Sequence, residues 1–168
     1  MQFRDLKKQY DVLKQEIDTS IFDVIQSTFF INGPQVKTLE VQLAKYVGIK
    51  HCITCGNGTD ALSMALMAWG IKEGDAVFVP DFTFFASGET VSFEGATPIF
   101  VDVDIDTFNM DPNCLEEAIK LVRAEGRLTP RVIVTVDLFG LPANYPKIRE
   151  IADQYGLKIL EDSAQGFG

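Results

Sequence analysis

The stretch that decides the fold is AVFVPDFTFFASGETVSFEGATPIFV, residues 76–101. It starts with the apolar run Ala76–Val79, continues through a helical pattern over Phe84–Phe93, and ends in a second apolar run, Pro98–Val101. Neither run alternates strictly between apolar and polar residues, which is typical of strands buried on both faces. Two such strands joined by one helix predict a right-handed crossover in a parallel sheet.

The same order of short strands and helices extends to both sides of this stretch. Further strands are predicted at His51–Cys55, Val132–Val136 and Leu157–Leu160. The helices between strands are predicted at about Asp60–Trp69, Pro112–Val122 and Tyr145–Tyr155. The fold class is therefore α/β, with three layers: a mostly parallel sheet and helices on both of its faces.

Two helices are predicted ahead of the sheet. Apolar residues recur at three- and four-residue steps from Leu6 to Ile25, which describes one face of an amphipathic N-terminal helix. A second helix is opened by Pro34 and closed by Gly48. We divide the chain into residues 1–33, an N-terminal helix and loop, and residues 34–168, which carry the sheet.

Composition limits the partners of this chain. It has 168 residues, 15 basic and 24 acidic, and its net charge of -9 repels phosphate backbones and anionic lipid surfaces. Its beginning is charged from the fourth residue without an apolar signal region, and no later segment reaches membrane-spanning length. We expect a cytoplasmic protein with neither nucleic acid nor a membrane as partner.

Two motifs suggest a metal site, and both are rejected. Cys52 and Cys55 form a C-x-x-C pattern beside His51, but a strand would place the two sulfurs on opposite faces, so we expect small buried hydrophobes. The acids of VDVDIDTFNMDP, residues 101–112, lack the glycine and final glutamate of a calcium loop. We expect a solvated turn there, and a helix that starts at Asp111 and Pro112.

Ligands of parallel sheets bind beyond the carboxyl ends of the strands. The first predicted strand is followed by GNGTDAL, residues 56–62, where a helix N-terminus could hold a phosphate. The ordinary alternative is a helix capped by Thr59 or Asp60. A dinucleotide site also fits, with Gly56, Gly58 and Ala61 as the glycine-rich pattern and Asp81 as the ribose acid.

Two other strand ends carry candidate side chains. Phe82, Phe84 and Phe85 follow the second predicted strand, where they could stack on a planar ring or fill the core, and we expect at least one in the core. Asp162 follows the last strand. Its carboxylate could cap a turn or pair with a cationic group of a cofactor.

Taken together, these motifs resemble the DegT/DnrJ/EryC1/StrS sugar aminotransferases, pyridoxal-phosphate enzymes of the aspartate aminotransferase fold class. The resemblance rests on six segments in the family's order, which are FRDLKKQY, FINGPQVKTLE, CGNGTDAL, PDFTFFAS, VDVDIDTFNMDP and EDSAQGFG. Within the family, the sequence looks closest to members that act on UDP-linked N-acetylated keto-sugars.

The resemblance implies a role for six residues in binding pyridoxal phosphate. Thr59, with backbone groups of Gly58 and Asp60, would hold the phosphate, and Phe84 would stack on the pyridine ring. Asp162 would face the pyridine nitrogen and keep it protonated. Gln165 would lie near the ring hydroxyl. The loop Phe30–Pro34, at the end of the 1–33 segment, would approach the sugar nucleotide.

The resemblance also implies a lysine that this chain does not supply. The family places its Schiff-base lysine after the D-x-x-Q motif, beyond Gly168, and Lys158 precedes Asp162 on the strand and should not replace it. We therefore expect the N-terminal part of a longer enzyme, inactive alone, with no catalytic residue and no metal of its own. The small departures from the family pattern at Gly88, Leu141 and Asn144 leave the cofactor residues intact.

The expected partners follow from the family. They are a nucleotide-linked keto-sugar, an amino-acid donor, which we expect to be glutamate, and a second copy of the chain in a homodimer. Three alternatives stay open: a truncated chain that only binds a cofactor or partner, a related dehydratase in which histidine replaces the lysine, and the dinucleotide module.

Overall fold

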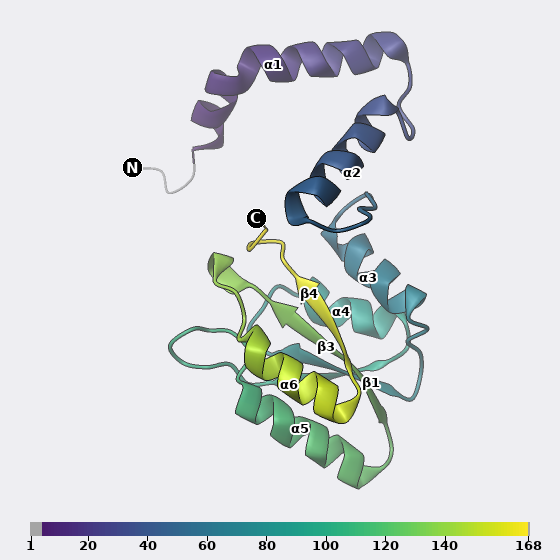
Figure 1. Ribbon diagram of the computed structural model, residues 1–168, viewed down its shortest axis with the longest axis vertical. Coiled ribbons are helices and arrows are strands. Elements are labelled where there is room, and N and C mark those ends of the chain that lie inside the picture. Colours follow the sequence, from purple (N-terminus) through teal and green to yellow (C-terminus); the bar gives the residue numbers. More distant parts are fainter. Residues whose placement is uncertain (1–4, 168) are drawn as a thin grey trace. The chain divides into compact units, whose positions relative to one another are not determined.

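The computed structural model describes residues 5–167, and the chain divides into two compact units, Met1–Thr54 and Cys55–Gly168. The first unit contains α1 (Leu6–Ser27) and α2 (Pro34–Val47). The second contains four strands and the remaining helices (Figure 1). Its elements are α3 (Gly58–Ala68), β1 (Asp75–Pro80), α4 (Ala86–Phe93), β2 (Thr97–Val101), α5 (Pro112–Glu125), β3 (Thr129–Val136), the short 3-10 helix η1 (Leu138–Gly140), α6 (Tyr145–Tyr155) and β4 (Lys158–Asp162).

The four strands form one parallel sheet in the order β2-β1-β3-β4. The register places Phe78 of β1 between Ile99 of β2 and Ile133 of β3, and Ile133 in turn faces Ile159 of β4. Because side chains alternate between the faces of a strand, these four residues make one apolar row across a single face. The predicted parallel α/β sheet is confirmed.

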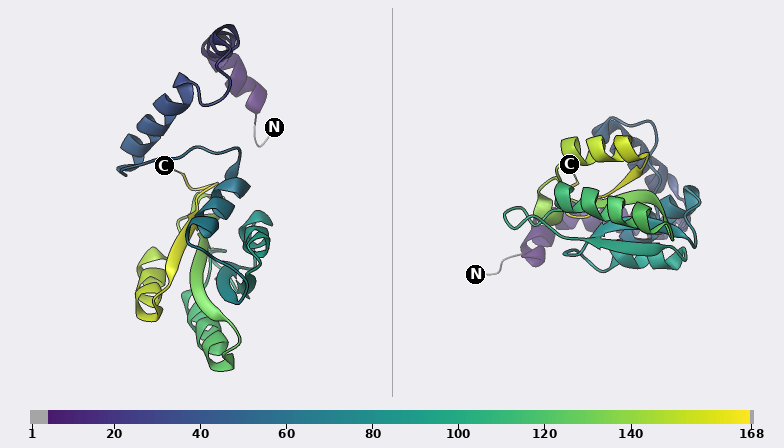
Figure 2. Two further views of the ribbon diagram at one scale, coloured as in Figure 1. Left: turned by 90° about the vertical axis from the view of Figure 1, so that its right-hand side faces the viewer. Right: turned by 90° about the horizontal axis from the view of Figure 1, so that it is seen from below.

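Each face of the sheet has its own core. The row with Phe78 packs with residues of α5 and α6, such as Leu115, Ile119 and Ile148, all of which are fully buried. The opposite face carries a second cluster, whose members are Leu66, Ile71, Val77, Val79, Val91, Ala96, Val132 and Val134. Two of these come from α3 and α4, and Figure 2 shows helices on both sides of the sheet. The three layers of the prediction are therefore present.

The helix ends follow the sequence signals. Pro34 is the first residue of α2, and Gly48 ends it with a left-handed φ of 74°. Asp111 caps α5 by accepting a hydrogen bond from the backbone N–H of Asn113 at 2.7 Å. The solvated turn predicted before this helix is also present, because Asp104 accepts from the backbone N–H groups of Asp106 and Thr107. The backbone and hydroxyl bonds from Thr107, and to a smaller extent the bond from Asp106, lower the pKa of the Asp104 carboxyl.

The strand predicted at His51–Cys55 is wrong. No ladder forms over these residues, and the backbone N–H and the hydroxyl of Thr54 bond instead to Oε1 of Glu40, at 3.0 and 2.9 Å. The two bonds lower the pKa of the Glu40 carboxyl, with the backbone bond as the larger cause. An apolar run becomes a strand only when another strand pairs with it, and in the described chain this run has none.

The two cysteines of this run are not the buried hydrophobes that we expected. Cys52 is half-buried and Cys55 is exposed, because no sheet covers the segment. Both are free thiols, as is Cys114. Across residues 5–167, no group of three or more histidine, cysteine or acidic side chains is arranged to hold a metal ion.

None of the described helices is both long enough and apolar enough to cross a membrane.

The buried face of α5 offers a test of this core. Leu115 is fully buried whereas Leu121, on the same helix, is 62% exposed. We expect Leu115→Ala to lower the free energy of unfolding by about 2–5 kcal/mol, because the cavity that it leaves cannot fully collapse. Leu121→Ala should change it by less than about 0.5 kcal/mol. Urea denaturation measures both, and equal losses would contradict the assigned face of α5.

Candidate functional site

A cavity of about 250 Å³ lies beyond the carboxyl ends of β3 and β4. We call it the strand-end cavity. Its wall combines the start of α3, the segment before α4, and the residues that follow the two strands. The lining residues are Gly58, Thr59, Leu62, Thr83, Phe84, Ala86, Val136, Leu138, Asp162, Ala164 and Gln165. Five of the six residues predicted to bind the cofactor are among them.

The start of α3 supplies hydrogen-bond donors to this cavity. Gly58 and Thr59 are the first residues of the helix, so their backbone N–H groups have no carbonyl partner within it. The hydroxyl of Thr59 makes no hydrogen bond within the described part of the chain and lines the cavity. This end of the helix can therefore offer three donors and a partial positive charge to an anion.

The sixth predicted residue, Asp60, does not line the cavity. Its backbone N–H donates to Oδ1 of Asn57 at 2.9 Å, and its carboxylate accepts from Nδ2 of the same side chain at 3.0 Å. Asn57 is thus the residue that caps the helix. The alternative of a cap at Thr59 or Asp60 is therefore wrong, and the helix begins two residues earlier than predicted.

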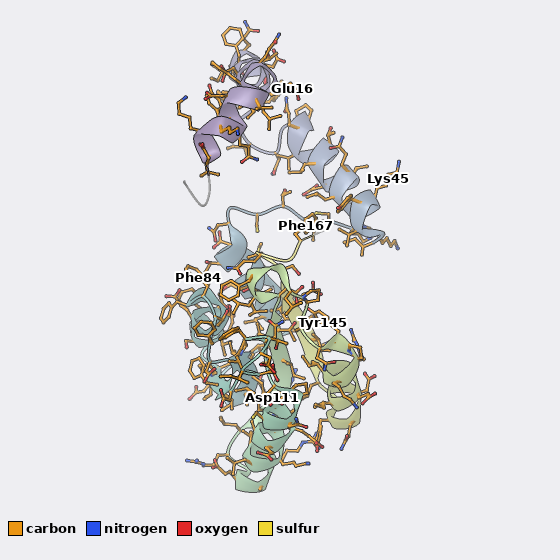
Figure 3. The ribbon with its side chains drawn as sticks, turned by 90° about the vertical axis from the view of Figure 1, so that its left-hand side faces the viewer. Glu16, Lys45, Phe84, Asp111, Tyr145 and Phe167 are labelled. Atoms are coloured by element: carbon orange, nitrogen blue, oxygen red, sulfur yellow. The ribbon has the colours of Figure 1, made fainter. Side chains whose placement is uncertain are left out.

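The three phenylalanines after β1 all lie at the surface. Phe82, Phe84 and Phe85 are exposed by 51%, 73% and 75%, so the expectation that at least one fills the core is wrong. The buried cluster on one face of the sheet contains Val77, Val79 and Val91 and none of these rings. Of the three residues, only Phe84, which is labelled in Figure 3, is among those that line the strand-end cavity. Its face remains available for a planar ligand.

Asp162 is held by a hydroxyl of α4. Ser87, fully buried in the first turn of α4, donates from Oγ to Oδ2 of Asp162 at 2.9 Å. Oγ1 of Thr83 lies 3.0 Å from the same Ser87 oxygen. The other carboxylate oxygen, Oδ1, accepts a longer bond of 3.3 Å from the backbone N–H of Ala164. The carboxylate therefore has a fixed position at the cavity wall.

Gln165 is fixed by the loop that follows β3. Its Oε1 accepts a hydrogen bond from the backbone N–H of Phe139 at 2.6 Å. Phe139 has a left-handed φ of 57°, a conformation that costs a non-glycine residue energy. With its carbonyl oxygen occupied, the amide of Gln165 has its NH₂ group left to offer a ligand.

Asp137 holds the segment that follows β3 in place. This buried residue accepts hydrogen bonds at Oδ1 from the hydroxyl of Tyr145 at 2.8 Å and from the backbone N–H of Ala143 at 3.0 Å. Burial, and to a smaller extent the bond to Asp137, raise the pKa of the Tyr145 hydroxyl above its usual range. A Cβ atom at Gly166 would lie only 2.5 Å from the Cβ of Asp137, so the turn after β4 needs glycine there.

Sequence reasoning missed both Ser87 and Asp137. A signal for Ser87 was its spacing, since Thr83 precedes it by four residues and a helical turn would bring the two hydroxyls together. Asp137 stands directly after a buried strand, like Asp162, and that position was the signal for it. Asp81, the acid of the dinucleotide alternative, does not line the strand-end cavity. It lines a neighbouring groove, which shares Thr83 and Phe84 with that cavity.

Comparison of this chain with known proteins identifies its family. Residues 11–168 match the DegT/DnrJ/EryC1/StrS aminotransferase family. The chain belongs to this family. It is 45% identical, over 170 aligned residues and all of its own length, to the UDP-2-acetamido-2-deoxy-3-oxo-D-glucuronate aminotransferase of Pseudomonas aeruginosa. The resemblance drawn from the sequence is confirmed.

Solved structures of the DegT/DnrJ/EryC1/StrS family have the same fold. A family member from Brucella abortus has a TM-score of 0.96 and 49% identity over 98% of this chain. NtdA from Bacillus subtilis, solved with bound cofactor PMP, has a TM-score of 0.84 and 34% identity over 92% of this chain. Pyridoxal phosphate is thus confirmed as the cofactor of the family.

The chain spans less than half the length of these relatives. It covers 45% of the Pseudomonas aeruginosa protein, 44% of the Brucella abortus chain and 34% of NtdA.

The close approach of Gly166 to Asp137 gives a testable prediction. Gly166→Ala should lower the free energy of unfolding by about 1–3 kcal/mol, because the added methyl group must displace the turn that carries Gln165. Gly58→Ala is the matched control, since a Cβ at Gly58 meets no atom within 4 Å. Thermal unfolding of both variants measures the difference. Equal stability of the two would contradict the tight packing of this turn.

Proposed function

We propose that the protein containing this chain is a pyridoxal-phosphate-dependent aminotransferase, which transfers an amino group from glutamate to a nucleotide-linked keto-sugar. The observation that carries the proposal is the composition of the strand-end cavity. It combines a helix N-terminus, an exposed aromatic ring and a fixed carboxylate at one end of a parallel sheet. These are the groups that a phosphorylated, cationic, planar cofactor requires.

Each part of the cofactor has a matching group in the cavity. The backbone N–H groups of Gly58 and Thr59, with the Thr59 hydroxyl, would hold the phosphate. The ring of Phe84 would cover the pyridine ring. The free NH₂ group of Gln165 would donate to the ring hydroxyl oxygen, because its carbonyl oxygen is bound to Phe139. The backbone N–H of Asp60, one of the expected phosphate donors, is already bonded to Asn57.

Asp162 carries the electrostatic part of the proposal. Its carboxylate would hold a proton on the pyridine nitrogen, since a nearby negative charge favours the cationic form. When bound, the protonated cofactor supplies an electron sink for the carbanion formed as a C–H bond of the substrate breaks. Ser87 and Ala164 keep the carboxylate in place for this role.

The base that moves the proton between carbon atoms has to come from elsewhere in the protein. No lysine lines the cavity among the described residues. The ammonium group of Lys158 instead lies 5.2 Å from the ring centre of Trp69, at the other end of β4. We therefore propose that the Schiff-base lysine lies beyond Gly168, and that residues 1–168 alone would bind the cofactor without completing the reaction.

The substrate proposed is a UDP-linked N-acetylated keto-sugar. It is supported by the name of the Pseudomonas aeruginosa relative, which describes a UDP-linked 2-acetamido-3-oxo sugar acid. We also propose that the loop Phe30–Pro34, at the end of the N-terminal segment 1–33, approaches this substrate.

A homodimer in the cytoplasm completes the proposal. The homodimer is supported by the surface of α1, a helix that buries none of its residues. Among its apolar side chains, Ile21 and Ile25 are 55% and 54% exposed.

The role of Asp162 can be measured by binding of pyridoxamine phosphate, which needs no Schiff base. Asp162→Asn should weaken binding about 10–100-fold, because the amide removes a charge-assisted hydrogen bond to the ring nitrogen. Asp81→Asn makes the same chemical change at the end of β1 and should leave the dissociation constant within about twofold. Fluorescence titration gives both constants. An equal or larger effect at Asp81 would contradict the role proposed for Asp162.

The reaction itself separates the aminotransferase from its alternatives. With glutamate and a UDP-linked keto-sugar, the complete protein should form 2-oxoglutarate and amino-sugar in equal amounts, because each amino group leaves one substrate for the other. A dehydratase would consume the sugar and leave glutamate unchanged. A chain that only binds the cofactor would consume neither. Chromatography of both products decides between them, and dTDP-linked keto-sugars test the nucleotide preference.

A further inference from the structure

The buried face of α4 carries two hydroxyl groups that differ in their surroundings. Ser87 is fully buried and donates a hydrogen bond to Asp162. Thr90 lies one turn further along the helix and is 1% exposed, and its Oγ1 has no hydrogen-bond partner among the described residues. Burial of a hydroxyl costs free energy unless it is hydrogen-bonded. Ser87 offsets that cost with its hydrogen bond to Asp162, whereas Thr90 has no such bond among the described residues.

The direction of the hydrogen bonds at Ser87 follows from counting protons. A hydroxyl group has one proton to donate, and that of Ser87 is given to Oδ2 of Asp162, since a carboxylate oxygen can only accept. The contact of 3.0 Å with Thr83 must therefore run from the Thr83 hydroxyl to Ser87. The result is a chain of two donors that starts at a residue lining the cavity and ends on the carboxylate. Hydrogen bonds in such a chain strengthen one another.

This chain links two elements that are far apart in the sequence. Ser87 and Asp162 are separated by 75 residues, and they belong to α4 and to the end of β4. The second contact of the carboxylate, from the backbone of Ala164, is longer at 3.3 Å. Ser87 therefore supplies the shorter of the two bonds that fix the Asp162 side chain.

We propose that Ser87 is a positioning residue, which holds the Asp162 carboxylate in the orientation needed to meet the cofactor's ring nitrogen. The inference rests on the proposed function of Asp162 and extends it to a residue outside the cavity wall. Ser87 does not line the strand-end cavity. It acts through the carboxylate, and Thr83 acts through Ser87.

The test compares two ligands that differ only at the ring nitrogen. Pyridoxamine phosphate and its 1-deaza analogue, in which a C–H group replaces that nitrogen, are titrated into the protein and into the Ser87→Ala variant. Ser87→Ala should weaken binding of pyridoxamine phosphate about tenfold, because the carboxylate is no longer held in place. Binding of the deaza analogue should change by less than about twofold, since the analogue makes no such contact with Asp162.

The analogue also reports whether the variant is folded. A variant with a damaged cavity would lose affinity for both ligands equally, and this outcome would overturn the proposal, because Ser87 would then support the cavity as a whole. Unchanged affinity for both ligands would overturn it as well. Thr90→Val is the matched control. It removes a hydroxyl of similar burial from the same helix, and it should leave both affinities within about twofold of the parent values.

The same two ligands separate this inference from the proposed function. If Asp162→Asn leaves the ratio of the two affinities unchanged, the role proposed for Asp162 is wrong. If Asp162→Asn lowers the preference for pyridoxamine phosphate and Ser87→Ala does not, the role of Asp162 stands and only that of Ser87 is wrong.

Discussion

Burial of both faces of the parallel sheet is the constraint on which the rest of this structure depends. Phe78, Ile133 and Ile159 share one face, and a shift of any strand by one residue would exchange its two faces. The register is therefore fixed by the core. It also fixes the ends of the strands, where the backbone N–H of Asp137 donates to the carbonyl of Asp162 at 3.2 Å. The acids at the edge of the sheet thus take their positions from apolar packing beneath them.

Anion binding at the strand-end cavity depends on groups in direct contact with the anion more than on the net charge of the chain. The chain has a net charge of -9, which at long range repels a phosphate. Screening limits that repulsion to about 8–10 Å at physiological ionic strength, whereas the donors at the start of α3 act in direct contact. No lysine or arginine lines the cavity in the part of the chain that the structure describes. Anion binding here therefore depends on the backbone of Gly58 and Thr59 more than on side-chain charge.

The sequence predicted what local patterns determine and missed what distant partners determine. The four strands β1 to β4 and the helices around them were predicted because each carries its own apolar pattern. The run at His51–Cys55 has such a pattern too, yet it forms no strand, since pairing is a property of two segments. Five of the six expected cofactor residues meet at one cavity. Ser87 and Asp137 were missed because their partners lie in other elements, so that only the folded chain reveals their contacts.

The composition of α4 reflects its position between core and cavity. This helix has eight residues, and its buried residues include Ser87, Gly88 and Thr90, which are all poorer helix formers than alanine. Gly88 has a packing reason, since a Cβ there would lie 3.3 Å from the ring of Phe100 on β2. The absence of a side chain lets the helix lie close against the sheet, and the neighbouring Ser87 reaches the end of β4 from that position. The helix thus gives up about 0.5–1 kcal/mol of intrinsic stability at Gly88, and the close packing brings a buried hydroxyl within hydrogen-bond distance of the carboxylate.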